Sequence, residues 1–187
     1  MKFADLVPYV MPEVPGANVI AIEQALLNAA REFCRQTWVW THQPTVTIRA
    51  GRTYATLAPR IPAKSAVCGL DGWESEDTSI APSLRNGDTE LFVDDAPAAD
   101  TRYVLTLALF PSRTADEMPD WLAGAHRDAI TAHAKHEIML LPEKTWTNPG
   151  RAQVLYTIFS DAVNEAKRNR NISRLRGRMR MRVPGVR

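Results

Sequence analysis

The sequence has few cysteines and no long hydrophobic run. Only Cys34 and Cys68 occur among its 187 residues, too few for a disulfide framework or for a zinc site built on paired thiolates. No stretch approaches the roughly 20 apolar residues that cross a bilayer, and the first apolar run is too short for a signal peptide. We therefore expect a protein of cytosolic origin, without membrane association, that keeps both thiols buried and reduced.

The motifs of common catalytic sites are also missing. The nine glycines are scattered and form neither G-x-G-x-x-G nor G-x-x-x-x-G-K, and there is no G-x-S-x-G elbow. The acidic groups Asp94-Asp95 and Glu74-Ser75-Glu76-Asp77 fall in predicted loops, where solvated carboxylates are the simpler interpretation because acid-base catalysis needs an enclosed site. We predict that the protein is not an enzyme and uses no cofactor.

Three histidines form the strongest candidate for a metal site. His126, His133 and His136 fall in one predicted helix with Glu137 beside them, so a metal could take two or three of their side chains. The spacing is not His-Glu-x-x-His, and no Cys or further His completes a tetrahedral set. We favour half-buried helix residues over the alternative, a metal-dependent hydrolase.

Charge is divided unevenly along the chain. The formal net charge is +2, yet the segment from Lys167 to Arg187 holds nine basic residues and no acidic one. Subtracting these nine from the 23 basic residues leaves 14 against 21 acidic residues in positions 1–166, a net charge of −7. The sequence therefore describes an acidic body with a basic end.

Apolar periodicity and capping residues predict three helices. Asn18 is suited to cap the first helix, and Pro119 to the first turn of the second. Asn148 followed by Pro149 is the best start signal in the sequence. The predicted helices span about residues 18–37, 119–140 and 149–170.

The segment between the first two helices is typical of short strands. Val46 and Ile48 alternate with polar residues, as in a half-buried strand, whereas residues 103–110 are apolar at nearly every position and should be covered on both faces. Asp71-Gly72 and Asn86-Gly87 are typical of tight hairpin turns. These features predict a small antiparallel sheet.

The predicted fold class is α+β, a helical bundle with a small antiparallel β-sheet module inserted over about residues 45–110. One domain covers residues 1–170, and an extended basic C-terminal arm covers 171–187. The proline-rich segment up to Gly16 is expected to be extended.

The basic arm allows three interpretations. It could order on a partner protein, since Arg alternates with Met or Val from Arg178 to Val183, as suits an added strand. It could contact nucleic acid phosphates, although no aromatic residue is interleaved for base stacking. It could also be a solubilising tail. We favour a partner-binding role for Arg174, Arg176, Arg178, Met179, Arg180, Met181, Arg182 and Val183.

The order of these features resembles that of the head-to-tail adaptor proteins of tailed bacteriophages, over about residues 5–168. The opening match is Asp5-Leu6-Val7-Pro8-Tyr9-Val10 with Pro12, Val14, Pro15 and Gly16, then Ala25-Leu26-Leu27-Asn28-Ala29-Ala30-Arg31-Glu32-Phe33-Cys34-Arg35-Gln36-Thr37 and Trp40. The later match is Gly51, Tyr54, Leu57, Asp71-Gly72, Phe110-Pro111, Met118-Pro119-Asp120-Trp121-Leu122, Pro142, Lys144, Trp146, Asn148-Pro149 and Phe159. The segment His133-Ala134-Lys135-His136 departs from the small and leucine-rich pattern of that family.

The resemblance implies a structural subunit at the neck of a virion, assembled in the host cytoplasm. Copies would form a homo-oligomeric ring, commonly a dodecamer, between the portal protein and the tail or nozzle proteins. Genomic DNA would pass through the ring without sequence-specific binding, and the arm would dock on the portal. A tail-completion or stopper protein of the same neck, and a nucleic-acid-binding protein that uses the arm, are the alternatives.

Overall fold

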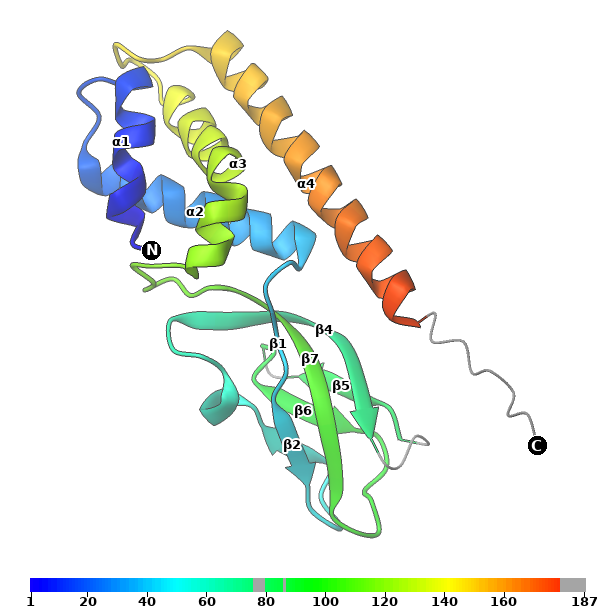
Figure 1. The fold of residues 1–187 in the computed structure, drawn as a ribbon. Coiled ribbons are helices and arrows are strands. Elements are labelled where there is room, and N and C mark those ends of the chain that lie inside the picture. Colours follow the sequence, from blue (N-terminus) through cyan, green and yellow to red (C-terminus); the bar gives the residue numbers. More distant parts are fainter. Residues whose placement is uncertain (76–79, 86, 179–187) are drawn as a thin grey trace.

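A computed structural model describes residues 1–75, 80–85 and 87–178 of the chain. It consists of a helical body above a β module, with the longest helix running down one side (Figure 1). The helical body holds a 3-10 turn at Phe3–Leu6, α1 Val7–Val10, a 3-10 turn at Met11–Glu13, α2 Val19–Thr37, α3 Asp120–Met139 and α4 Pro149–Arg178. The β module holds β1 Thr41–His42, β2 Thr45–Ile48, β3 Tyr54–Thr56, a 3-10 turn at Ala58–Arg60, β4 Ser65–Ser75, β5 Pro82–Arg85, β6 Glu90–Val93 and β7 Thr101–Pro111.

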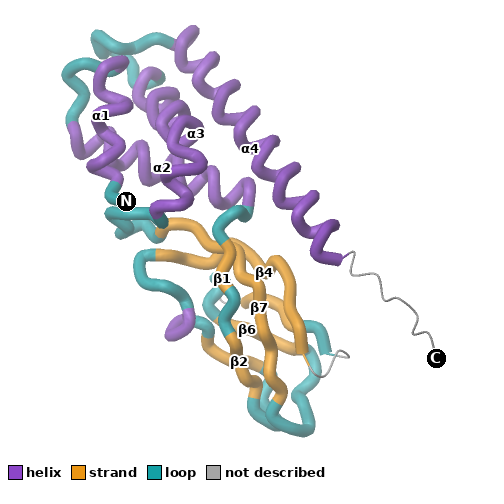
Figure 2. Tube along the Cα trace, viewed as in Figure 1, coloured by secondary structure: helices purple, strands orange, loops and turns teal. Residues whose placement is uncertain are grey.

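This arrangement confirms the predicted α+β class, with the strands inserted between helices (Figure 2). The helix starts follow the predicted caps. The Asn18 side chain accepts a hydrogen bond of 2.9 Å from the Ile20 amide, and α4 begins at Pro149. The apolar stripes of α2, α3 and α4 meet in one core, which the N-terminal segment also enters.

The N-terminal segment is helical, and the prediction that it is extended was wrong. Pro8 lies in the first turn of α1, and Pro12 lies at the start of the 3-10 turn Met11–Glu13. In that position the fixed φ of proline favours a helical start and its missing N–H is not needed. The short turns bury Phe3, Leu6 and Val10 in the helical core. The number of prolines in the segment does not indicate this burial.

The β module contains two antiparallel sheets rather than one. The strand β7 pairs with β4 along one edge and with β1 and then β2 along the other, while β3, β6 and β5 form the second sheet. Pro44 lies between β1 and β2, where a missing N–H interrupts the ladder. The two sheets enclose a second core of buried residues, Val46, Ile48, Leu57, Val67, Leu91, Val93, Tyr103, Leu105, Leu107 and Leu109.

The two predicted hairpin turns have different outcomes. Asp71-Gly72 is not a turn, because β4 continues through it and its register with β7 shifts between Leu70 and Gly72. Asp71 is the extra residue of this β-bulge. In contrast, β5 and β6 form a hairpin in which Arg85 pairs with Glu90 and Gly87 has a φ of +68°. Asn86 lies outside the described residues.

The strand β7 joins the two cores. Its first half alternates between buried and half-buried or exposed residues, and the predicted coverage on both faces holds only from Leu107 to Pro111. Leu109 belongs to the core of the β module, and the adjacent Phe110 belongs to the core of the helical body. Trp40 packs against both cores, so the two parts share side chains at their junction.

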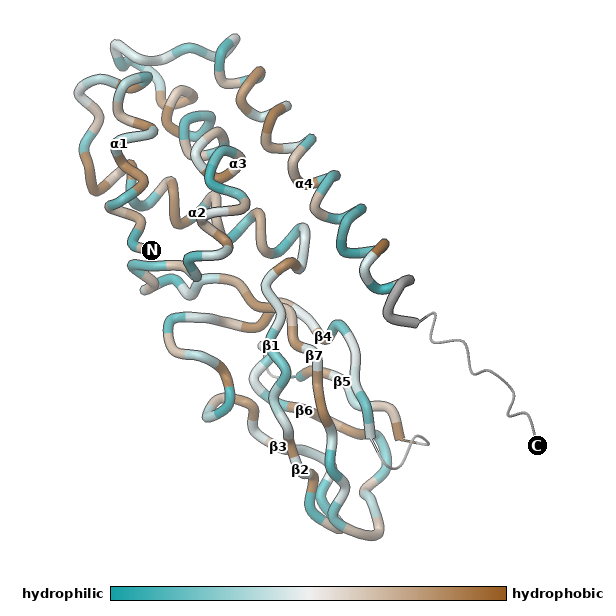
Figure 3. The backbone as a smooth tube through the Cα atoms, in the orientation of Figure 1, coloured by the Kyte–Doolittle hydropathy of each residue, from teal (hydrophilic) through white to brown (hydrophobic). Residues whose placement is uncertain are grey.

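The helix α4 continues to Arg178, beyond the predicted end at residue 170. The predicted domain boundary therefore falls inside this helix, and residues 171–178 are helical rather than extended. The apolar stripe of α4 stops at Ala166, and Figure 3 shows that the part of the helix that follows is mostly hydrophilic. Another interaction must hold this end of the helix, and it comes from the β module.

Candidate functional site at the base of the C-terminal arm

A buried carboxylate of the β module holds the last turns of α4. The Asp71 side chain is only 7% exposed and forms ion pairs with Arg170 and Arg174. Arg174 also donates a hydrogen bond of 2.6 Å from Nη2 to the backbone carbonyl oxygen of Asp71. We call this group of three residues the α4 clamp.

The β-bulge explains why Asp71 is available to α4. A bulge residue is left without a partner in the ladder, and its side chain can be aimed away from the normal alternation. β4 pairs only with β7 among the described strands, so its other edge is open beside the end of α4 (Figure 1). Arg174 covers a backbone carbonyl on this edge.

Trp38 supports the α4 clamp from the end of α2. Its backbone has a left-handed φ of 54°, and the Arg170 guanidinium lies 5.0 Å from the centre of its ring. The indole also packs on Gly69, where an added Cβ would lie only 2.6 Å from the ring. Position 69 is therefore restricted to glycine by contact with Trp38.

The charges in the α4 clamp do not cancel. Two guanidinium groups share one carboxylate, and the side chains of Arg170 and Arg174 are 20% and 46% exposed. Burial, and then the charge of Arg174, lower the pKa of Arg170. Removing one partner of a buried pair leaves a poorly solvated charge. Because Asp71 is the partner of both arginines, we expect its loss to destabilise this end of α4.

A cleft of about 540 Å³ lies beside the α4 clamp. Its walls come from the end of α2, β4, β7, α3 and α4, and they include Trp38, Asp71, His126, Arg170 and Arg174. The base of the C-terminal arm is thus a place where both parts of the molecule contribute side chains.

The predicted partner-binding residues are only partly within the described chain. Arg174 belongs to the α4 clamp, and Arg176 and Arg178 lie in the last turns of α4. Met179, Arg180, Met181, Arg182 and Val183 lie outside the described residues. Asp71, Arg170 and Trp38 were not predicted as site residues, since no local pattern indicates an ion pair between residues 99 positions apart.

Of the three histidines of the metal hypothesis, His133 and His136 lie next to each other, with 5.7 Å between their ring centroids, and each of the three also makes contacts of its own. His126 stacks on Phe33 with 4.6 Å between ring centroids, and His133 packs on Phe159 at 4.3 Å. His136 Nδ1 lies 2.9 Å from the carbonyl oxygen of Ala152. Within the described ranges, no group of three His, Cys, Asp or Glu side chains is placed to hold a metal ion.

The two cysteines differ in burial. Cys34 is buried as predicted, whereas Cys68 is only half-buried. Burial raises the pKa of Cys34 to about 12 and that of Cys68 to about 11. Both thiols are therefore protonated near neutral pH, which makes them poor nucleophiles.

No family model matches the chain, and no curated protein matches it. None of the helices in the described part of the chain has the length and apolar character to span a bilayer. The function is therefore inferred from the residues of this chain.

Proposed function

We propose that the protein is a head-to-tail adaptor subunit of a tailed-phage virion. In this proposal, copies form a ring under the portal protein and extend the DNA channel toward the tail, and the C-terminal arm docks on the portal. The order of helix, β insert and two helices supports the proposal, because the same order carries the sequence resemblance. The acidic body also suits a channel wall, since like charge keeps DNA from sticking.

The observation that carries the proposal is the way α4 presents the arm. The helix has 30 residues, which corresponds to about 45 Å at the usual rise per residue. Its first half is fixed by apolar packing and its last turns by the α4 clamp. The arm is therefore joined to a helix end whose position is fixed, as a segment that must reach a neighbouring protein would require.

Deletion of residues 179–187 tests this proposal. The cut leaves Arg170 and Arg174 in place, so the shortened protein should keep its fold and remain soluble. We expect it to fail to join portal-bearing heads, as measured by the fraction of particles with a neck in electron micrographs. The matched control keeps residues 179–187 in scrambled order, which preserves charge and length. Normal assembly by the shortened protein would contradict the docking role.

A nucleic-acid-binding role is the second candidate, and the nine basic residues from Lys167 onward favour it. It predicts an affinity for duplex DNA that falls steeply with salt, because phosphate contacts release counterions. Portal docking instead predicts dependence on one protein partner. Fluorescence anisotropy with a labelled duplex at low and at physiological salt separates the two.

A tail-completion or stopper role in the same neck is the remaining alternative. It shares the location and the basic arm with the adaptor but differs in the surface on which the protein sits. Imaging the protein in assembled particles distinguishes them, because an adaptor contacts the portal directly. A density located only at the tail side would reject the adaptor role.

A further inference from the structure

Three neighbouring pockets lie along α2. Asn28 and Arg31 line both a pocket of about 470 Å³ and one of about 310 Å³, and Arg35 lines the latter and a third of about 560 Å³. Adjacent pockets share lining residues, so the three lie in a row along α2. We call this the α2 furrow.

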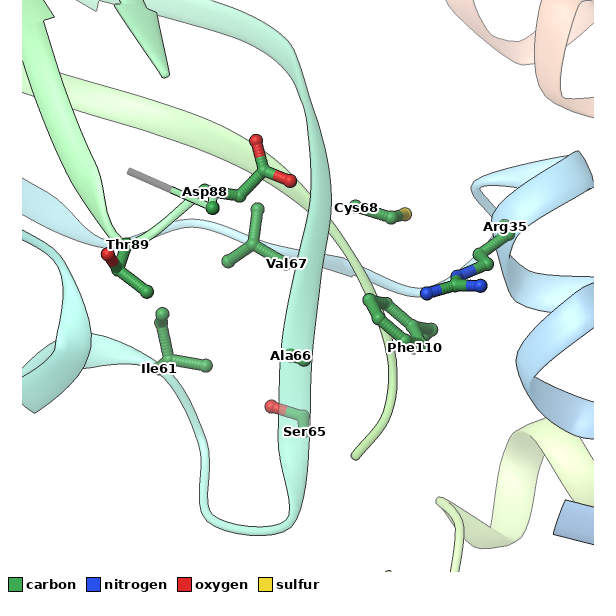
Figure 4. A pocket seen from close by; sticks show the side chains of 10 residues that line it. Arg35, Ile61, Ser65, Ala66, Val67, Cys68, Asp88, Thr89 and Phe110 are labelled. Atoms are coloured by element: carbon green, nitrogen blue, oxygen red, sulfur yellow. The ribbon is translucent and has the colours of Figure 1, made fainter. Parts of the chain in front are cut away.

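Arginine residues gather around one aromatic ring in the α2 furrow. The guanidinium carbons of Arg31 and Arg35 lie 4.8 Å and 4.4 Å from the centre of the Phe110 ring. Arg31 is further fixed by a hydrogen bond of 2.8 Å from Nη1 to the carbonyl oxygen of Pro111. Figure 4 shows Arg35 reaching from α2 toward Phe110 at one end of the pocket of about 560 Å³, with Asp88 and Thr89 at the other end.

These arginines, Arg31, Arg35 and Arg113, have no ion-pair partner in the described part of the chain, residues 1–75, 80–85 and 87–178. Burial lowers the pKa of Arg31, and the charges of Arg35 and Arg113 lower it further. Like charges held this close repel one another, so a bound anion would relieve the repulsion.

We infer that the α2 furrow binds an acidic segment of another protein. Its carboxylates would pair with Arg31, Arg35 and Arg113, since a guanidinium presents its N–H groups in the fork that a carboxylate accepts, and Phe110 holds two of the three in place. The third pocket, which the apolar side chains of Ile61 and Val67 also line, would take an apolar side chain of the same segment.

A protein segment fits the α2 furrow better than a nucleic acid does. Glu32 and Glu137 line the middle pocket and Asp88 lines the third, so acidic side chains alternate with the arginines along the furrow. A continuous phosphate backbone would meet these carboxylates, whereas a peptide can place each carboxylate against an arginine. None of the described residues of the C-terminal arm lines these pockets, and the inference goes beyond the proposed function.

The test uses the full chain and a short fluorescein-labelled peptide of glutamate and leucine. In the variant Arg35→Gln/Arg113→Gln we expect the Kd of the peptide to rise about tenfold or more, the effect of losing charge-assisted hydrogen bonds. The variant Phe110→Leu should also weaken binding, since it removes the ring that orients the guanidinium groups. Circular dichroism and the unfolding midpoint show whether each variant is folded.

Two control variants remove the same charge elsewhere. Arg49→Gln/Arg52→Gln changes exposed arginines of the β module, and Arg180→Gln/Arg182→Gln changes the arm. Both should bind the peptide within about twofold of the unchanged protein, a difference well under one hydrogen bond. Equal losses in all three double variants would overturn the inference by showing a non-specific charge effect.

Two further outcomes would also overturn it. If a labelled oligothymidine bound with the same dependence on Arg35 and Arg113, the occupant would be a nucleic acid. If the unchanged protein formed dimers in sedimentation experiments and Arg35→Gln/Arg113→Gln did not, the occupant would be a second copy. Retained peptide binding in Arg35→Lys/Arg113→Lys, weaker than in the unchanged protein, is the result expected for fixed guanidinium groups.

Discussion

Replacing Asp71 by Asn tests whether the α4 clamp holds the end of α4. The substitution keeps the shape of the side chain and removes its charge, which leaves Arg170 and Arg174 without a carboxylate. Breaking a buried ion pair on one side costs about 3–5 kcal/mol. The Arg174 side chain is 46% exposed, so solvent screening reduces this, and we expect a loss of about 2 kcal/mol.

The loss should appear mainly in the last turns of α4. None of the side chains from Lys167 to Arg174 is fully buried, so the contact of Arg170 with Trp38 is the main packing that supports this end besides the ion pairs. A loss of about 2 kcal/mol raises the equilibrium constant for opening of this helix end roughly 30-fold. Hydrogen exchange of the amides of residues 170–178 measures this opening directly, while the amides of residues 152–163 should exchange as before.

The control is Asp161→Asn, an exposed aspartate on α4 that makes the same charge change. It should leave the exchange of residues 170–178 unchanged, because Asp161 belongs to no ion pair of the described chain. A double-mutant cycle of Asp71→Asn with Arg170→Gln gives the coupling between the two side chains. Unchanged exchange in Asp71→Asn would refute the reasoning.

Two further predictions concern packing and pH. Gly69→Ala should lower the free energy of unfolding by about 1–3 kcal/mol, because its Cβ would clash with Trp38. Gly72→Ala is the matched control in urea denaturation, since an added Cβ there meets nothing within 4 Å. Burial, and then the charge of His136, lower the pKa of His133, so stability should fall as pH drops below the ordinary value of 6.5. The urea midpoint between pH 7.5 and 5.5 should fall less in His133→Gln, and an equal fall in both proteins would contradict this role. Burial raises the pKa of Glu137, which opposes the loss at lower pH.

The sequence predicted those features that depend on neighbours along the chain. Asn18 and Asn148 signal helix starts because a cap acts within the first turn, and Val46 and Ile48 show the alternation of a strand with one buried face. The N-terminal prolines were misread, since proline suits both an extended segment and a first helical turn. There, burial of apolar side chains decided between the two.

Features that join distant segments could not be predicted. Asp71-Gly72 is locally a good turn, and only pairing of β4 with β7 makes Asp71 a bulge residue. The polar residues at the end of α4 predicted an extended arm, yet ion pairs with Asp71 hold this part of the helix. Similarly, the repulsion between Arg31 and Arg113 arises because the chain returns to α2 after β7.

The α4 clamp connects the C-terminal end of α4 to the β module, so a force applied at that end acts on both parts of the molecule. A pull on the C-terminal end passes along α4 to β4 at Asp71 and then through the ladder to β7. From there Phe110 transmits it into the core that holds the first half of α4. The force is therefore shared between the helices and the sheets. Separation of α4 from the body, starting at its C-terminal end, requires the ion pairs of Arg170 and Arg174 with Asp71 to break first.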